Sequence, residues 1–515
     1  MSRLAWRLGT RRVRRHAECI VPGLFAKEGG ADGQSRAGRL AQAVGSGERR
    51  TVVEPTWELD VWAQENFGGC ELGDERSTAR VVKLAQQMAE HPDGSTPDQT
   101  EHWADLKAAY RLIDREEVTF AAVASPHWEL TRRRARGTVL VIGDTTELDF
   151  GWDRQASGLG PVGNGSGRGF LLHNALAVDA ATSEILGLAG QEVLYRRPKP
   201  QGENSYRRTQ REGKESEVWA RLIARIGRPA EGVTYVHVFD RGADNLDVFC
   251  QLRQARGEWV IRASHLHRVV DELTADGPRP RCALQTVLDR QPVLGTYELS
   301  VRATKEQPAR MAKLAVRVAK VFVPPRSKRR TALQRKLQFA GLEQWVVEAR
   351  EIDPPKGVMP VHWVLWSSRP VETFDDAWQI LTDYERRWLI EEFHKALKTG
   401  CRVEARQHQT AKRLEVMTGL CSVIAVRLVQ LKTLARTAPQ TPAERGVPRV
   451  WLDMLRALRK TSIVSVRDFY RHLAGLGGFL MRKGDGEPGW ITLWRGTEKL
   501  RAAIRGYFSM KKKCG

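Results

Sequence analysis

The sequence predicts an α/β protein with a mixed-sheet core, a β-rich insertion and helical regions on both sides. Between about residues 138 and 264, apolar runs follow the order strand, strand, strand, helix, strand, helix, strand. Strand-like runs continue to about residue 371, over a stretch too long to be a loop. Before residue 134 and after residue 450, apolar residues recur at helical spacing instead.

The N-terminal part divides into an extension and a helical domain. Residues 1–53 are rich in Arg, Gly and Ala and lack apolar periodicity, so we expect a disordered basic extension. Residues 54–135 are expected to form amphipathic helices, as in the run DERSTARVVKLAQQMAEHP. Their basic faces suit a DNA-binding domain, although a plain solvated face explains any single helix about equally well. The basic residues concerned are Arg76, Arg80, Lys83, Lys107 and Arg111.

The predicted core, residues 136–268, carries two aspartates on its strands. Asp144 lies within the β-branched run TVLVIGDTTELDF, and Asp240 ends the apolar run VTYVHVF. A carboxylate in an apolar strand is costly unless it is paired or bound to a metal. For either aspartate alone, a turn or cap role is the commoner explanation. Three further aspartates compete for the same assignment: Asp149, Asp179 and Asp244.

The C-terminal half is predicted to interrupt and then complete the core. Residues 269–372 form the β-rich insertion, which includes the strand-like run VHWVLWSS. Residues 373–437 return to the core as helices, one of them strongly apolar from residue 414 to 435. After the linker-like run TAPQTPAERGVP, residues 438–515 form a helical C-terminal domain.

The charge of the chain favours a polyanionic partner. Its 515 residues include 83 Lys and Arg against 61 Asp and Glu, for a net charge of +22. Nucleic acid is a commoner partner than a membrane for a basic chain without lipidation signals. The 16 tryptophans and 41% apolar residues indicate packed domains, unlike a histone-like protein.

Cysteine spacing and hydropathy exclude several classes. The 7 cysteines form no CxxC pair and no Cys/His cluster, so we expect a reducing, cytoplasmic compartment, no structural zinc and no disulfide framework. Apolar runs such as residues 138–142 are too short to cross a bilayer, and no membrane span is expected. The Gly-rich stretch 158–169 lacks the Lys and Ser/Thr of a P-loop.

The most specific pattern is YERRWLIEEFHKALKTG, in which Tyr384, Arg387, Glu391 and Lys398 are spaced by three, four and seven residues. On one continuous helix, at about 100° per residue, the four fall within an arc of about 60°, with Lys395 close by. Such a face would hold a metal on its carboxylate while its cations grip phosphates. A salt-bridged surface helix gives similar spacings, but a chance match of all four residues is rare.

Three carboxylates are predicted to converge at one edge of the sheet. Adjacent strands would bring Asp144 and Asp240 together, and a helix packed on the sheet would deliver Glu391. An oxygen-rich site of this kind suits Mg²⁺ or Mn²⁺. Two such ions would activate a water or a 3′-hydroxyl and stabilise the leaving oxygen at a phosphorus.

These motifs resemble those of bacterial insertion-sequence DDE transposases, in the insertion-sequence-four family and the branch that contains the transposon-five transposase. The residues that carry the resemblance are DTT at Asp144, FDRGAD at Asp240 and the Y-(2)-R-(3)-E-(6)-K element from Tyr384 to Lys398. Similarity in LGDERSTAR, IDPPKG, AVRLVQL and LGGFL extends it over about residues 57–508. The resemblance implies an RNase H-like catalytic core, an N-terminal domain that recognises transposon ends and a C-terminal dimerisation domain.

The resemblance also implies roles for individual residues. Asp144, Asp240 and Glu391 would be catalytic and bind two Mg²⁺ or Mn²⁺ ions per active site. The residues implied to hold phosphates are Tyr384, Arg387 and Lys398, with Lys395 as a weaker candidate. Trp363 would pocket a flipped base when the DNA end forms a hairpin, and a core tryptophan is the alternative. Arg241 and Arg262 would contact DNA, or would equally serve as ion-pair partners.

The implied activity is cut-and-paste transposition, with a DNA hairpin as intermediate. Its partners would be double-stranded DNA with terminal inverted repeats, target DNA and a second copy of the chain, in a bacterial nucleoid. A metal-dependent nuclease or resolvase is one alternative, because it needs the acidic triad but no phosphate grip for strand transfer. A non-catalytic DNA-binding regulator is another, and the intact triad speaks against it.

Overall fold

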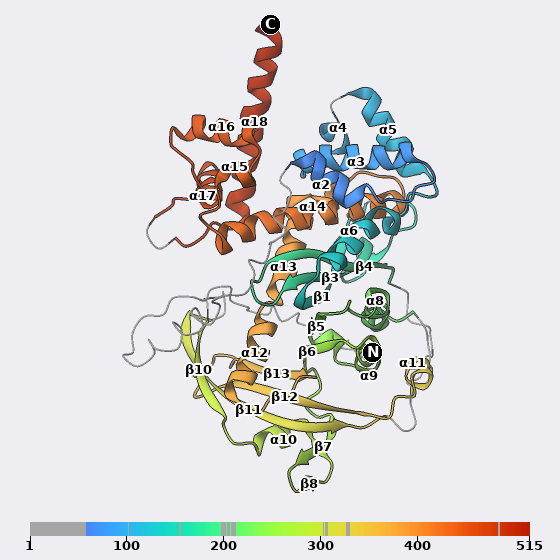
Figure 1. The fold of residues 1–515 in the computed structure, drawn as a ribbon, viewed down its shortest axis with the longest axis vertical. Coiled ribbons are helices and arrows are strands. Elements are labelled where there is room, and N and C mark those ends of the chain that lie inside the picture. Colours follow the sequence, from blue (N-terminus) through green and yellow to red (C-terminus); the bar gives the residue numbers. More distant parts are fainter. Residues whose placement is uncertain are drawn as a thin grey trace, which may run out of the picture.

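The computed structural model describes residues 58–514, except 101, 154–155, 197–201, 203–206, 208–212, 302, 304–306, 326–329 and 483–484. The extension predicted for residues 1–53 lies outside the described residues. The N- and C-terminal helices lie above the core strands of a large sheet in Figure 1, and the strands of the insertion lie below them.

The N-terminal helices pack beside the long helix α14 (Ala411–Thr437), at the upper right of Figure 1. They are α2 (Leu59–Phe67), α3 (Glu75–Glu90), α4 (Thr96–Gln99), α5 (Trp103–Asp114) and α6 (Phe120–Arg134). α3 begins at Asp74, whose carboxylate accepts a hydrogen bond from the Ser77 N–H, and a cap of this kind stabilises a helix by about 1 kcal/mol. The apolar face predicted for α3, including Leu84 and Met88, is buried.

Five strands form the core of the sheet, in the spatial order β4, β3, β1, β5, β6. They are β1 (Gly137–Asp149), β3 (Gly167–Asp179), β4 (Ile185–Leu194), β5 (Val233–Phe239) and β6 (Glu258–Arg262). β3 is antiparallel to both β1 and β4, whereas β5 and β6 run parallel to β1. With α8 (Val218–Ile226) before β5 and α9 (Leu246–Ala255) before β6, the predicted order of elements is confirmed, and the core is RNase H-like.

The Gly-rich stretch 158–169 takes part in this sheet. The short strand β2 (Gly160–Val162) pairs antiparallel with the first residues of β3. The glycines therefore belong to a β-hairpin, in agreement with the absence of a P-loop signature.

Helices cover both faces of the core sheet. Successive residues of a strand point to opposite faces, and Leu140 and Ile142 of β1 lie in the hydrophobic cluster shared with α14. Val139 and Val141 point the other way and pack with Leu222 of α8. By length and composition α14 passes the test for a membrane span, the only described helix that does, but most of it is buried inside the protein, as in the core helix of a soluble protein.

The residues predicted as an insertion extend the same sheet, because β13 (His362–Ser367) pairs antiparallel with β6. The other elements of this part are β7 (Val269–Thr274), β8 (Gly277–Pro278), β9 (Cys282–Ala283), α10 (Leu284–Asp289), β10 (Gly295–Val301), β11 (Arg310–Val323), α11 (Ala332–Lys336) and β12 (Leu342–Glu351). Pairing with β13 satisfies the backbone groups that β6 would otherwise expose as an edge strand.

The C-terminal helices form a cluster with a hydrophobic core of their own. They are α15 (Ala443–Gly446), α16 (Arg449–Arg459), α17 (Val466–Leu476) and α18 (Trp490–Cys514). The end of α18 projects away from the rest of the molecule (Figure 1).

The prediction of one continuous helix for residues 384–398 is wrong. α12 (Phe374–Glu385) ends before Arg387, α13 (Trp388–Lys395) follows, and Lys398 lies in the π-helical turn η3 (Ala396–Gly400). At the junction the N–H groups of Arg387, Leu389 and Ile390 bond three residues back, as in a 3₁₀ turn. No proline or glycine marks this junction. The buried Asp383 instead ties it down through ion pairs with Arg386 at 3.0 Å and Arg369 at 2.5 Å.

A buried arginine joins the N-terminal helices to the segment that follows α13. Arg406 lies just after η4 (Val403–Ala405), and its guanidinium donates to Gln99 Oε1 at 2.7 Å and to the carbonyl oxygen of Pro92 at 3.1 Å. A third bond reaches the carbonyl oxygen of Cys401. Since the guanidinium is buried and its bonds span both parts, the N-terminal helices are held in a defined position relative to α13.

Candidate active site

Asp144 and Asp240 lie side by side on neighbouring strands. In the parallel register of β1 and β5, Gly143 is paired with Phe239, so that the next residue of each strand is an aspartate. The Asp144 carboxylate accepts a hydrogen bond from the Thr145 N–H at 2.7 Å, and that of Asp240 accepts one from the Gly242 N–H at 2.8 Å. The two carboxylates are therefore held at one edge of the sheet, as predicted from the strand pattern.

The surroundings of Asp144 disfavour its negative charge. Burial, followed by the charge of Asp240, raises the pKa of the Asp144 carboxyl to about 7, and Arg387 opposes this rise. The ionised form of Asp144 is thus disfavoured, first by burial and second by a neighbouring carboxylate. A bound cation would favour that ionised form.

Gly143 permits the close approach of the two strand ends. A Cβ atom at this position would lie 2.5 Å from Phe239 Cε1 and 3.1 Å from Trp219 Cζ3, where atoms overlap. Because Phe239 directly precedes Asp240, any larger residue at position 143 would displace Asp240 from Asp144.

Arg387 connects Asp144 to Glu391 on α13. Its Nη2 donates to Glu391 Oε1 at 2.7 Å, and its Nη1 lies 3.4 Å from Asp144 Oδ2. The Arg387 side chain is 2% exposed, whereas that of Glu391 is 42% exposed. Within the part of the chain that the structure describes, no three His, Cys, Asp or Glu side chains gather closely enough to hold a metal ion, and the Arg387 guanidinium lies between two of the three predicted ligands.

The donor set nonetheless fits a hard divalent cation. Asp144, Asp240 and Glu391 offer only carboxylate oxygens, which Mg²⁺ and Mn²⁺ prefer.

Tyr384 and Trp363 are buried against each other. Their rings meet edge to face with centroids 5.9 Å apart, and the residues are 2% and 8% exposed. Arg262 is also buried, and its Nη2 donates to the carbonyl oxygen of His362, next to Trp363. The contacts of Trp363 here are those of a core tryptophan, which was the alternative to base stacking.

The remaining predicted cations lie on the segments that carry Glu391 and Asp240. Lys398 Nζ bonds the carbonyl oxygen of Glu147 at 2.5 Å and pairs with Glu404 at 3.1 Å. Lys395 is largely exposed and pairs with Glu392 at 3.4 Å. Arg241 is exposed in the 3₁₀ turn that follows Asp240.

Each of the three competing aspartates has a structural contact of its own. Asp179 accepts hydrogen bonds from the N–H groups of the turn after β3, and Asp149 accepts from the Gly151 N–H at 2.9 Å. Asp244 pairs with Arg268 at 2.6 Å. Turn and ion-pair roles thus account for all three.

The sequence analysis missed the polar residues that lie behind the acidic cluster. Thr145 Oγ1 is 2.7 Å from His173 Nδ1, and Asn174 Nδ2 is 3.0 Å from His394 Nε2. The two partners of the second pair are 220 residues apart in the chain. No spacing or motif predicts such a contact, and a single His in an apolar strand is usually interpreted as a core residue.

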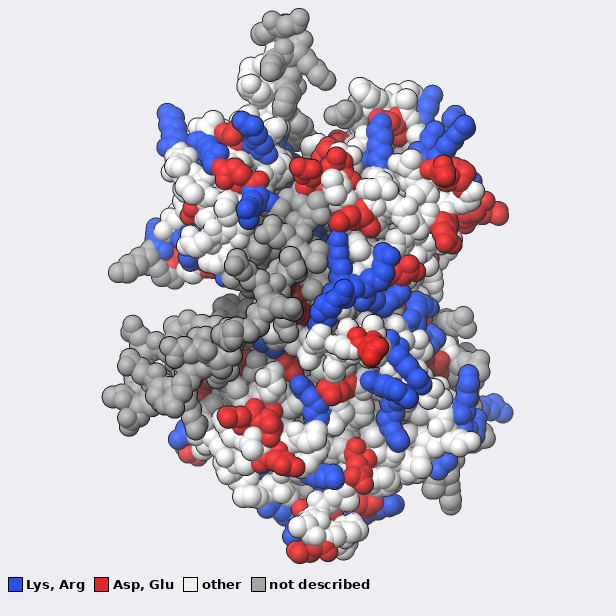
Figure 2. Space-filling view, viewed as in Figure 1, with Lys and Arg blue, Asp and Glu red and all other residues white. Residues whose placement is uncertain are grey.

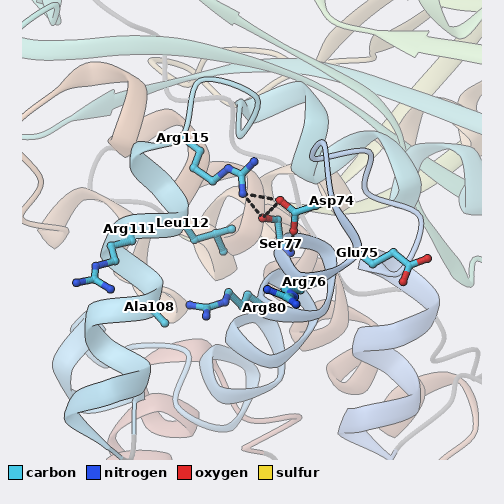
Figure 3. Close-up of a pocket in the computed structure, with 9 residues that line it drawn as sticks. All are labelled: Asp74, Glu75, Arg76, Ser77, Arg80, Ala108, Arg111, Leu112 and Arg115. Carbon is cyan, nitrogen blue, oxygen red and sulfur yellow. Dashed lines mark hydrogen bonds and ion pairs between the residues drawn. The ribbon is translucent and has the colours of Figure 1, made fainter.

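A basic cleft lies between α3 and α5. It has a volume of about 590 Å³, and Figure 3 shows Arg76 and Arg80 from α3 beside Arg111 from α5. At its margin Arg115 donates to Asp74 Oδ2 at 2.6 Å and to Ser77 Oγ at 2.7 Å. On the face drawn in Figure 2, Lys and Arg side chains also gather below the N-terminal helices. This surface suits the phosphates of a nucleic acid.

Three stretches of the chain match transposase families. Residues 60–118 match the transposase DNA-binding family, residues 204–427 the transposase DDE domain, and residues 423–511 the transposase Tn5 dimerisation domain. The DDE match includes Asp240 and Glu391 and begins after Asp144.

Among solved structures, the chain is similar to a piggyBac transposase synaptic complex with hairpin DNA. The two are 11% identical, and the match covers 84% of this chain and 76% of that chain with a TM-score of 0.33.

Proposed function

The chain belongs to the Tn5-like DDE transposases, and we propose that it moves a DNA element by cut-and-paste transposition with Asp144, Asp240 and Glu391 as its acidic triad. The observation that supports the assignment of the triad is that Asp144 lies beside Asp240 on the neighbouring strand and contacts Arg387, which also pairs with Glu391. We propose that the protein acts on DNA in the cytoplasm, at the nucleoid.

We propose that the three carboxylates hold two Mg²⁺ or Mn²⁺ ions. Such ions lower the pKa of an attacking hydroxyl and stabilise the leaving oxygen of a phosphodiester. In the metal-free protein, Arg387 compensates the charges of Asp144 and Glu391. Metal binding would release its guanidinium, which could then bind a phosphate of the DNA end. Arg387 would thus exchange carboxylates for phosphate as the site is loaded.

The reaction would proceed by in-line displacements at phosphorus. A water oxygen attacks at the end of the element, and the 3′-hydroxyl leaves. That hydroxyl attacks the phosphorus of the opposite strand, which closes the element end as a hairpin and releases the flanking DNA. A second water opens the hairpin, and the regenerated 3′-hydroxyl attacks target DNA.

Tyr384, Lys395 and Lys398 would help to hold the DNA end. Lys398 and Lys395 lie along α13 and η3 at the margin of the carboxylates, where cations suit phosphate. Trp363 would receive the flipped base only after it separates from Tyr384, so we propose that this pair opens when the hairpin forms. Arg241 and Arg262 would contact the same DNA end.

The N-terminal helices would bind the terminal repeats, and the C-terminal helices would join two chains. The exposed arginines of the cleft supply the phosphate contacts, which position a duplex without reading its sequence. The dimerisation match includes α18, where Ile491 and Met510 are each 65% exposed. Exposed apolar side chains on a projecting helix suit burial against a second copy.

The test uses the DNA that flanks this gene as substrate. We expect the full-length protein with MgCl₂ to nick and then release the element, with a hairpin visible on a denaturing gel. Asp144→Asn and Glu391→Gln should each lower the cleavage rate by at least about 10³-fold while DNA binding persists. Asp149→Asn, on the same strand as Asp144, is the matched control and should cleave normally.

The same assay separates the alternatives. Cleavage that survives Asp144→Asn would refute the triad, and a wild-type protein that binds but never cuts would support the regulator. Cleavage without hairpin or strand transfer, unaffected by Arg387→Ala, would support the simple nuclease.

A further inference from the structure

Asn174 is the register partner of Asp144. In the antiparallel pairing of β1 and β3 the two residues lie directly opposite, so their side chains project from the same face of the sheet. Asn174 is fully buried, and its Oδ1 accepts a hydrogen bond from Gln191 Nε2 at 2.6 Å. That bond, together with one from Asn174 Nδ2 to the carbonyl oxygen of Leu172 at 3.2 Å, holds the Asn174 amide in one orientation. Gln191 Nε2 also donates to Ser422 Oγ on α14 at 3.1 Å.

That orientation directs the Asn174 amide nitrogen at α13. Asn174 Nδ2 lies 3.0 Å from Nε2 of His394. Burial, with the nearby charges of Lys398 and Arg387, lowers the pKa of His394 to about 3, so the ring is neutral. With Nδ2 as the donor, Nε2 accepts and the ring proton is assigned to Nδ1.

The helix and sheet spacings explain why one helix can serve both strands. Glu391 and His394 are three residues apart on α13, which corresponds to a rise of about 4.5 Å along the axis. β1 and β3 are neighbouring strands, which are about 4.8 Å apart. α13 can therefore place Glu391 at β1, linked to Asp144 through Arg387, while His394 contacts Asn174 on β3.

We propose that Asn174 and His394 are positioning residues that hold Glu391 at its working distance from Asp144. The inference rests on the proposed function, because it assumes that these two carboxylates share a metal. Arg387 would not hold this distance throughout, because a bound metal would take its carboxylate partners. The Asn174–His394 contact involves none of the three carboxylates and would persist when Arg387 moves.

The expected variants follow from the chemistry of the contact. His394→Leu removes the acceptor and leaves the Asn174 amide without this partner, whereas His394→Gln keeps an acceptor oxygen the same number of bonds from the backbone. Ser422→Ala is the matched control, because it disturbs the far end of the same network and leaves the contact with His394 intact.

The experiment compares full-length variants by three measurements. They are the single-turnover cleavage rate of the gene-flanking DNA, the MgCl₂ concentration at half-maximal rate, and the rise in melting temperature on adding MgCl₂ without DNA. DNA binding in EDTA, followed by fluorescence anisotropy, is the check on overall structure.

We expect His394→Leu to raise the half-maximal MgCl₂ concentration by about 10-fold or more and to slow cleavage by about 10–100-fold. Its melting response to MgCl₂ should weaken, while the Kd for DNA in EDTA stays within about 2-fold of wild type. His394→Gln should recover most of the loss, and Ser422→Ala should behave as wild type. If His394→Leu does not fold, Asn174→Ala should show the same shift in MgCl₂ requirement.

The inference would be overturned if His394→Leu and Asn174→Ala had the wild-type half-maximal MgCl₂ concentration. It would also be overturned if His394→Gln cleaved as slowly as His394→Leu. The proposed function fails separately. It fails if the wild-type protein neither cleaves nor responds to MgCl₂, or if Asp144→Asn keeps the full MgCl₂ response.

Discussion

Asp144→Asn should abolish DNA cleavage and yet stabilise the metal-free protein. Burial and the charge of Asp240 raise the pKa of Asp144 from 3.8 to about 7, so the folded state resists the ionisation that the unfolded chain undergoes freely. The amide of asparagine has similar size and no charge, and its Oδ1 can still accept from the Thr145 N–H. The variant therefore removes a destabilising charge and keeps the local hydrogen bond.

The magnitude follows from linkage. Below pH 3.8 the Asp144 carboxyl is protonated in the folded and the unfolded state and does not change the free energy of unfolding. Between pH 3.8 and about 7 only the unfolded chain ionises, so the penalty grows with pH, and above pH 7 it is complete. At about 1.4 kcal/mol per tenfold change in acidity, the ceiling is about 4 kcal/mol. Relaxation and water entry reduce it, and we expect about 1–3 kcal/mol at pH 8.

The assay is thermal unfolding of full-length protein in EDTA, followed by tryptophan fluorescence at pH 5 and pH 8. A gain of 1 kcal/mol corresponds to roughly 2–4 °C for a domain of about 200 residues. Asp149→Asn, at the exposed end of the same strand, should not stabilise the protein. With MgCl₂ the order should reverse, because only the wild-type site gains a ligand. An Asp144→Asn variant less stable than wild type in EDTA at pH 8, or equally stabilised at pH 5 and pH 8, would refute the reasoning.

Three further predictions concern other parts of the chain. Arg76→Ala, Arg80→Ala and Arg111→Ala should each reduce the slope of log Kd against log salt by about 0.9 in anisotropy titrations with duplex DNA, and an unchanged slope would contradict phosphate contact. Gly143→Ala should lower the stability by about 1–3 kcal/mol and slow cleavage, because its Cβ overlaps the Phe239 ring, and normal melting would show that the strands can spread. Burial raises the pKa of the Glu385 carboxyl to about 7, so its ionisation above that pH destabilises the folded state. Between pH 5 and pH 8 the free energy of unfolding should therefore fall in the wild type by at most about 3 kcal/mol more than in Glu385→Gln. Parallel pH profiles of the two proteins would contradict this.

Periodicity was a sufficient guide to the elements of the core. Runs of apolar β-branched residues marked β1 and β5, and the strand-helix order along residues 137–262 is the one predicted. The break between α12 and α13 could not be predicted in this way, because no proline or glycine marks it and the ion pairs of Asp383 at the junction include Arg369, from outside these helices. The continuation of the sheet from β6 into β13 was likewise invisible, since strand pairing over such separations leaves no local pattern.

The sequence by itself determined the chemistry that is available: two strand aspartates, one helical glutamate and cations at specific spacings. Those features are local, and hydrophobic periodicity reports them. Only the tertiary structure decided which groups meet. It set Arg387 between Asp144 and Glu391, buried Trp363 against Tyr384, and joined Asn174 to His394 and Arg406 to Gln99. The last two contacts join residues that are 220 and 307 positions apart in the chain. They form because packing of the whole chain buries these polar groups side by side, and buried polar groups are stable only when they are hydrogen-bonded.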